Sequence, residues 1–248
     1  MLILAMESSA KPASVAVCLD GELLGLYFQN SGLTHSRTLL SMAESLLKNL
    51  DLSVSDIELV AISSGPGSFT GVRIGVSAAK GLAWGLDIPV CGVSTLEAMA
   101  YQTPEPGVIL CPAMDARRGQ VYNALFKWQS GAPVRLCDDR AISLEELASD
   151  LSGLCKSPSQ PHSSDAIVIQ EPVITHPSCL IVGDGAKICY DFLAAAGISC
   201  KIASGLTRWQ TAHGVALAAL NAASIPAIEL EPSYLRPSQA ERELSARA

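Results

Sequence analysis

A glycine-rich stretch from Ser64 to Gly75 constrains the fold of this chain more than any other segment. It places four glycines and one proline within eleven residues, so its backbone must follow turns that other residues resist. The apolar run 59–62 before it predicts a buried strand, and the residues after it to Leu86 predict a helix. N–H groups at a helix start can bind an anion, but no Lys-Ser or Lys-Thr pair follows Gly71, which excludes a Walker A loop. A turn shaped for packing and a functional loop both stay open.

The helix after this stretch is unusually rich in small residues. They are Gly71, Gly75, Ala78, Ala79, Gly81, Ala83 and Gly85. Glycine inside a helix costs about 1 kcal/mol relative to alanine, so propensity alone disfavours this helix. Small side chains let two backbones approach closely, and we infer that another helix packs here, inside the domain or at a subunit interface. The charges of Arg73 and Lys80 exclude a membrane span.

The composition indicates a compact protein of a reducing compartment. With 49% hydrophobic and 17% charged residues the chain can bury a core, and its apolar runs are too short for a membrane span. The start at 1–7 predicts a strand and not a signal peptide. The eight cysteines are scattered and the four histidines lie far apart, so we expect buried thiols, a cytoplasmic location and no metal site. The net charge of −7 argues against a surface that coats nucleic acid, although Arg117-Arg118 forms one adjacent basic pair.

Two units with a similar order of elements follow each other along the chain. The first has strands at 2–6, 14–19, 22–29, 58–63 and 88–93, a hairpin at Asp20-Gly21, and helices at 34–50 and 71–86. The second, less regular unit has strands at 108–114, 121–128, 133–137 and 180–182, a helix from Ser143, and a last helix at 209–223. This repetition predicts an α/β protein with mixed sheets in two related lobes.

A break at 103–107, with two prolines and a glycine, suggests where the lobes divide. We expect a first lobe of residues 1–104 plus about 208–225, a smaller second lobe of residues 105–207, and an extended C-terminal tail at 226–248. Residues 156–166 predict a polar loop whose order the sequence leaves open.

Two acidic residues follow strands at positions where phosphate chemistry is often found. Glu7 precedes Ser8 and Ser9, and Asp184 lies between two glycines. Two carboxylates at strand ends would suit the metal side of a kinase or ATPase site. The plainer interpretation, which we favour, is that Glu7 ends its strand and Asp184 caps the next helix. His35, in the first turn of its helix, is likewise interpreted as a capping or surface group.

The segment 65–75, Gly-Pro-Gly-Ser-Phe-Thr-Gly-Val-Arg-Ile-Gly, resembles the signature of the bacterial TsaB (YeaZ) family. The match is long and ungapped, and supporting matches lie at 4–9, 92–96, 115–122 and 234–236, whereas 129–178 carries little resemblance. The resemblance implies a two-lobed actin-like (ASKHA, ribonuclease H-like) fold. It also implies a part in making N6-threonylcarbamoyladenosine in tRNAs that read codons beginning with A.

The resemblance further implies a division of labour between several proteins. A TsaD-type transferase paralogue would carry out the transfer, with a TsaB-like chain as its required scaffold and activator and a TsaE-type ATPase joining them. Without the transferase, the surface that binds it could instead hold a homodimer of this chain. Contact with tRNA would be indirect, through the complex, and the sequence leaves open whether Arg117 and Arg118 contact tRNA.

The resemblance also shows what this chain lacks. Where TsaD-like enzymes carry a metal-binding His-x-x-x-His, this chain has Thr95 and Met99, and a hydroxyl and a thioether are poor substitutes for imidazoles on a hard metal. The segment 183–185 is only a fragment of a nucleotide loop. We therefore predict a noncatalytic partner protein without a cofactor. The alternative is an autonomous ASKHA-type ATPase or kinase using Glu7 and Asp184; a metalloprotease would need the same missing histidines.

We place the partner interface on the helices 34–50 and 71–86. Its predicted residues are His35, Leu39, Met42, Gly71, Arg73, Gly75, Ala78, Ala79 and Leu82. A bulky residue at Gly75 or Ala79 should overpack such an interface. A vestigial nucleotide site would contain Glu7, Ser8, Ser9 and Asp184.

Overall fold

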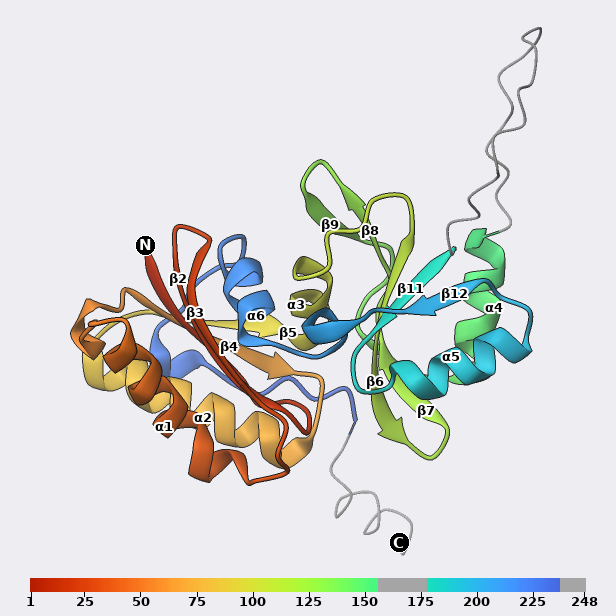
Figure 1. Ribbon diagram of the computed structural model, residues 1–248. Helices are drawn as coiled ribbons and strands as arrows, with labels where there is room; N and C mark the ends of the chain where they lie inside the picture. Colours follow the sequence, from red (N-terminus) through yellow and green to blue (C-terminus); the bar gives the residue numbers. More distant parts are fainter. Residues whose placement is uncertain (156–177, 237–248) are drawn as a thin grey trace, which may run out of the picture.

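The computed structural model describes residues 1–155 and 178–236, which fold into two α/β lobes (Figure 1). The first lobe contains β1 (Leu2–Glu7), β2 (Ala13–Leu19), β3 (Glu22–Gln29), α1 (His35–Asn49), β4 (Leu59–Gly65), α2 (Phe69–Leu86), β5 (Val90–Ser94) and α3 (Thr95–Tyr101). The second contains β6 (Ile109–Arg117), β7 (Gln120–Asn123), β8 (Phe126–Gln129), β9 (Ala132–Arg135), β10 (Arg140–Ser143), α4 (Leu144–Cys155), β11 (Cys179–Val182), α5 (Ala186–Ala195) and β12 (Cys200–Ile202). Helix α6 (Ala212–Ala219) then packs on the first sheet, and 3-10 turns lie at Val54–Asp56, Gly205–Arg208 and Ala227–Glu229.

The two lobes share one strand order. The first sheet runs β3-β2-β1-β4-β5, and the second runs β10-β7-β6-β11-β12, with the β8–β9 hairpin added beside β6. Three neighbouring strands are antiparallel in each sheet: β1, β2 and β3 in the first, and β6, β7 and β10 in the second. The other two strands, β4 and β5 or β11 and β12, run parallel to β1 or to β6. This duplication confirms the predicted two-lobed actin-like fold with mixed sheets.

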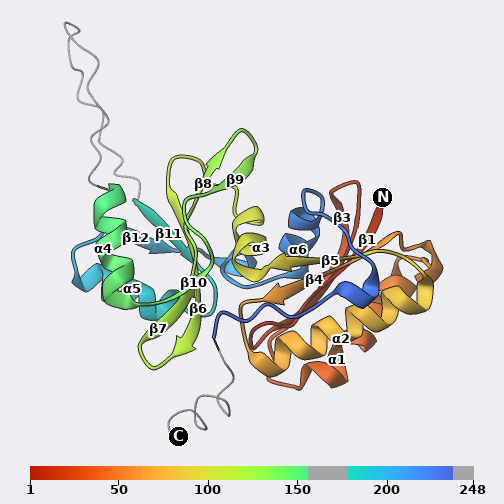
Figure 2. The ribbon, with the colours of Figure 1, turned by 180° about the vertical axis from the view of Figure 1, so that it is seen from behind.

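Helices cover both faces of the first sheet. Alternate residues of β1 explain this arrangement, because Leu4 and Met6 face a core shared with α1 and α2, while Ile3 and Ala5 face α3 and α6. Figure 2 shows α1 and α2 side by side on one face of the sheet. In the second lobe, α4 and α5 cover one face, whereas side chains of α3 join the core on the other. Helix α3 therefore contributes to the cores of both lobes.

Local signals in the sequence are confirmed at several turns and caps. Asp20 and Gly21 have φ of 49° and 90°, as the predicted two-residue hairpin requires. The hydroxyl of Ser94 accepts a hydrogen bond from the N–H of Glu97 and caps α3.

Five of the cysteines are buried in the cores, and burial raises the pKa of Cys18 and of Cys91 to about 11.

Other boundaries were predicted wrongly. The strand at 121–128 is divided into β7 and β8, and the buried amide of Asn123, the last residue of β7, donates to the carbonyls of Pro112 and Ala124. The predicted strand at 133–137 is confined to β9, and β10 was missed. The helix at 209–223 is only Ala212–Ala219: the backbone is extended at Trp209 and Thr211, and the Gln102 amide donates to the carbonyls of Thr207 and Trp209 just before the helix begins.

The remaining assignments concern the division into lobes and the ends of the chain. The predicted lobe boundaries stay a prediction. The polar loop at 156–166 and the last part of the tail, 237–248, lie outside the described residues. No helix within 1–155 or 178–236 is both long and apolar enough to cross a membrane.

Candidate functional site

The glycine-rich stretch wraps around the end of β1. A Cβ at Gly67 would lie 2.4 Å from the carbonyl oxygen of Ser9, and one at Gly71 would lie 2.1 Å from that of Ser8. The N–H of Ser68 donates to the Ser9 carbonyl over 2.6 Å, and the Ser8 hydroxyl donates to the Gly71 carbonyl over 2.9 Å. Glycine is thus required because the start of α2 approaches the backbone after β1 too closely for any side chain.

The buried small residues of α2 therefore serve the interior of the lobe. Gly71, Gly75 and Ala79 are buried, and a Cβ at Gly75 would meet the Ser8 hydroxyl and Ile62. The element that approaches closely on this face is the sheet, not a second helix. Three of the predicted interface residues thus have an explanation within the chain.

A different face of α2 is open. Ser77, Gly81 and Gly85 are exposed at one-turn intervals, and a Cβ at Gly81 or Gly85 would meet no atom of the described residues within 4 Å. Trp84, on the same helix, has 79% of its surface exposed. The open face thus combines small residues with one large exposed aromatic ring.

A groove of about 380 Å³ lies between α1 and α2, beside this open face. It is lined by His35, Ser36, Leu39, Leu40, Arg73, Ile74, Ser77 and Ala78. Four of the predicted interface residues, His35, Leu39, Arg73 and Ala78, therefore line one groove, whereas Met42 and Leu82 pack against the core.

His35 is fixed at the end of this groove by the loop after β1. Its Nε2 lies 2.8 Å from the carbonyl oxygen of Ala10, so Nε2 carries a proton and donates it. Its Nδ1 is buried without a partner among the described residues. The imidazole therefore joins α1 to the β1–β2 connection, which neither a cap nor a free surface group would do.

The predicted vestigial nucleotide site is divided between the lobes. Glu7 is 1% exposed, and its Oε1 accepts a hydrogen bond from the N–H of Ser9 over 2.5 Å. Burial raises the pKa of Glu7, and the hydrogen bond from the N–H of Ser9 opposes that rise. Its Oε2, together with the hydroxyls of Ser9 and Ser63, is buried without a partner among the described residues.

Asp184 does not cap the next helix, which corrects the interpretation from the sequence. Helix α5 begins after Gly185 and has no side-chain cap, while Oδ1 of Asp184 accepts from the Gln210 amide over 2.8 Å. Burial raises the pKa of Asp184, and the bond from Gln210 opposes the rise. Asp184 thus holds the segment before α6 and is not joined to Glu7 by any recorded contact.

The positions that carry histidines in TsaD-like enzymes lie in the interior here. Thr95 is fully buried at the start of α3, and Met99 packs in the core shared with the second lobe. Within the described residues, no group of three or more His, Cys, Asp or Glu side chains is placed to hold a metal ion.

The C-terminal tail binds along α2, which the sequence analysis did not anticipate. The N–H of Ser233 donates to the Ser64 carbonyl over 2.7 Å, and a Cβ at Gly65 would lie 2.3 Å from the Ser233 oxygen. The Tyr234 hydroxyl accepts from Nε of Arg73 over 2.7 Å, and its ring lies 4.9 Å from that of Phe69. The Tyr-Leu-Arg match at 234–236 was the one signal in the sequence for this contact.

The fold places the chain in a class: a two-lobed actin-like protein with a buried acid at the end of its first strand. The family model described as "TsaD: tRNA N6-adenosine threonylcarbamoyltransferase" matches residues 29–241. The TsaB biosynthesis protein of Bacillus subtilis is 36% identical over 146 residues, which is 59% of this chain and 64% of that protein. The Escherichia coli TsaB protein is 39% identical over 129 residues, or 51% of this chain and 55% of that protein.

Solved structures agree on the fold. A Pseudomonas aeruginosa protein described as similar to peptidase YeaZ has a TM-score of 0.71 at 24% identity, covering 95% of this chain and 99% of that one. This chain belongs to the TsaD family and, within it, to the TsaB (YeaZ) proteins. Its sequence matches span less than two thirds of the lengths of the two TsaB relatives.

Proposed function

We propose that this chain is a noncatalytic scaffold that binds and activates a TsaD-type transferase during formation of N6-threonylcarbamoyladenosine in tRNA. The names of its TsaB relatives support the pathway. A TsaE-type ATPase as a further partner and a cytoplasmic location are parts of the same proposal. The docking surface is the open face of α2 with the adjoining α1–α2 groove.

The observation that carries the proposal is the open row of Ser77, Gly81 and Gly85. Gly81, in the interior of α2, costs about 1 kcal/mol relative to alanine, and no packing within the described residues accounts for it or for Gly85 in the last turn. Close approach of a partner helix would account for them, because it needs a surface without side chains. Trp84, exposed beside this row, is the kind of residue that dominates binding energy in an interface.

The kinase or ATPase alternative is less well supported. The start of α2 packs against the backbone of Ser8 and Ser9, with Gly67 and Gly71 too close for a side chain, so this connection has little room to receive a phosphate. Burial raises the pKa of Glu7, and a carboxyl that resists ionisation is a weaker metal ligand. Turnover of ATP with magnesium by the purified chain, lost in Glu7→Gln, would favour this alternative over the scaffold.

The structure changes which variant tests the docking surface. Ala79→Trp would disrupt the lobe, because Ala79 is buried, whereas Gly81→Trp places the ring in open space. Gly81→Trp should weaken binding of the TsaD-type protein at least about tenfold, measured by calorimetry, by overpacking the interface. A matched variant, Lys187→Trp on exposed α5, should bind normally. Equal affinity of both folded variants would place the interface elsewhere.

Function itself is tested by reconstitution. Modification of a tRNA transcript by the transferase should depend on this chain and should fall with Gly81→Trp. If a homodimer uses the same surface, Gly81→Trp should also reduce self-association in sedimentation experiments. Full modification without this chain would contradict the activator role.

A further inference from the structure

Two arginines occupy the tip of the β6–β7 hairpin in a backbone conformation that costs free energy. Arg117 and Arg118 have φ of 63° and 57°, a region in which asparagine, aspartate and glycine are favoured. Oδ1 of Asp115 accepts from the N–H of Arg117 over 2.7 Å and supports this conformation. Both arginine side chains are exposed, so neither burial nor turn geometry explains why arginine stands here.

The C-terminal tail brings a third arginine to this tip. After Ser233 binds the Ser64 carbonyl on the first lobe, the tail crosses to the second lobe, where Nη1 of Arg236 donates to the Ala116 carbonyl over 3.1 Å. On the first lobe, the guanidinium carbon of Arg73 lies 3.7 Å from the centre of the Phe69 ring, and Nε of Arg73 donates to the Tyr234 hydroxyl of the tail. The tail thus connects arginines of both lobes through its own contacts.

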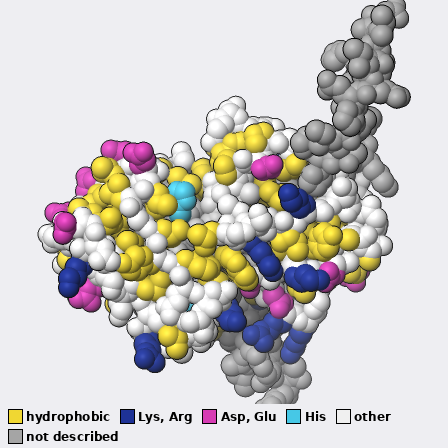
Figure 3. Space-filling view, viewed as in Figure 1, with side chains coloured by type: hydrophobic (Ala, Val, Ile, Leu, Met, Phe, Trp, Pro, Cys, Tyr) yellow, Lys and Arg dark blue, Asp and Glu magenta, His cyan; other side chains and the backbone are white. Residues whose placement is uncertain are grey.

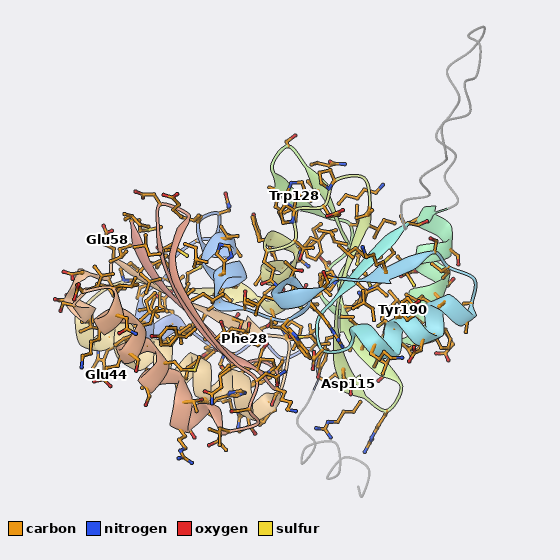
Figure 4. All side chains as sticks on the ribbon, viewed as in Figure 1. Phe28, Glu44, Glu58, Asp115, Trp128 and Tyr190 are labelled. Carbon is orange, nitrogen blue, oxygen red and sulfur yellow. The ribbon has the colours of Figure 1, made fainter. Side chains whose placement is uncertain are left out.

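We call Arg73, Arg117, Arg118 and Arg236 the arginine band; Arg73 also lines the docking groove, so the two proposed surfaces adjoin at this residue. Ion pairs recorded within 1–155 and 178–236 involve other cations, so these four guanidinium groups are not neutralised by a carboxylate there. Lys and Arg side chains gather along the lower edge of the molecule where the two lobes meet (Figure 3). Asp115, labelled in Figure 4, is an acid on the same edge, and its Oδ1 accepts a hydrogen bond from the backbone of Arg117.

The extent of the band indicates its ligand. Four arginines spread over two lobes suit an extended polyanion and not a single phosphate group. Guanidinium groups bind phosphate in a bidentate manner, and regularly spaced phosphates can be contacted one at a time along such a band. Because the whole chain carries a net charge of −7, this local excess of positive charge is a departure from the rest of the molecule.

We propose that the arginine band contacts the phosphate backbone of tRNA directly. This inference rests on the proposed function, since the transferase complex would bring tRNA to this chain. Binding by the chain alone is weakened by its net negative charge, so the contact adds to the binding by the complex.

The test uses the complex of the full chain with a TsaD-type transferase and a fluorescently labelled tRNA transcript. In Arg117→Asn/Arg118→Asn, asparagine keeps the left-handed turn and removes two charges. If the three arginines outside the docking groove each contact one phosphate, raising salt from about 50 to 200 mM should weaken that contribution about 40-fold, and only about 3-fold in the variant. Calorimetry of transferase binding, expected to be unchanged, separates failure of this inference from failure of the scaffold proposal.

Two controls decide the outcome. Lys127→Asn/Lys201→Asn removes the same charge away from the hairpin tip: Lys127 in β8 pairs with Ile109 at the start of β6, and Lys201 in β12 pairs with Leu180 of β11. This variant should leave the salt dependence of tRNA binding unchanged. Arg117→Lys/Arg118→Lys should restore most of the binding. Unchanged tRNA affinity in the asparagine variant would overturn the inference. If polyglutamate competed with tRNA as well as unlabelled tRNA does, the inference would also be overturned, because the band would then bind acidic proteins in general.

Discussion

The ends of β1 and β6 are equivalent positions in the two lobes, yet their surroundings are opposite. β1 stops one residue after its last pairing with β4, and Glu7 is buried there beneath the glycine-rich stretch. β6 continues from its last pairing with β11, at Pro112, to the exposed Arg117. One lobe has used this position for internal packing, whereas the other presents it to solvent.

This difference shows how two lobes with the same strand order can have separate roles. In the first lobe the backbone after β1 is held by Ser68 and Gly71, which fixes the start of α2 and so the docking groove. In the second lobe, Asp115 accepts from the N–H of Arg117, and Arg236 of the tail donates to the Ala116 carbonyl beside the two arginines at the hairpin tip. Substitutions at the first position should therefore affect folding, and those at the second should affect surface contacts.

The largest effect on the free energy of unfolding should come from the contact between Gly71 and the backbone after β1. Gly71→Ala places a Cβ 2.1 Å from the Ser8 oxygen, and overpacking of this kind should lower the free energy of unfolding by about 2–3 kcal/mol. Gly81→Ala, on the open face of the same helix, should raise it by about 0.5–1 kcal/mol. Urea denaturation measures both. Similar effects of the two variants would mean that α2 does not pack as closely on β1 as the structure shows.

How much could be predicted depended on whether the signal was local. The two-lobed fold followed from repeated elements, and the hairpin at Asp20-Gly21 and the cap at Ser94 from turn and capping chemistry. The glycines were correctly singled out, but their contacts with Ser8, Ser9 and Ser233 join segments far apart in sequence. Periodicity cannot reveal such contacts, so the sequence did not show that Gly75 and Ala79 pack within the lobe; their part in a partner interface stays a prediction.

A smaller effect, with a characteristic pH dependence, is expected at Glu7. Because burial raises the pKa of Glu7 above its ordinary 4.5, the folded state holds this proton more tightly than the unfolded state. Stability is therefore lost as pH rises through the ordinary value and up to the raised pKa. Glu7→Gln should gain on the order of 1 kcal/mol at neutral pH and nothing below about pH 4.

The measurement is the unfolding free energy from pH 4 to 8. Gln keeps an oxygen that can accept from the N–H of Ser9, so the geometry of the β1 end should persist. The matched variant Glu105→Gln, at an exposed position, should leave the pH dependence of unfolding unchanged. Parallel curves for Glu7→Gln and the parent chain would show that the buried carboxyl carries no penalty for ionisation.

The smallest effect is expected at the end of β6, and its sign is the informative part. Arg118→Asn should raise the unfolding free energy by up to about 1 kcal/mol, since asparagine tolerates the left-handed conformation better than arginine. Lys127→Asn makes a similar change in β8, where asparagine is disfavoured, and should lower it slightly. Thermal unfolding distinguishes the two. A loss of stability with Arg118→Asn would mean that this arginine supports the fold, and the contrast with the buried end of β1 would then disappear.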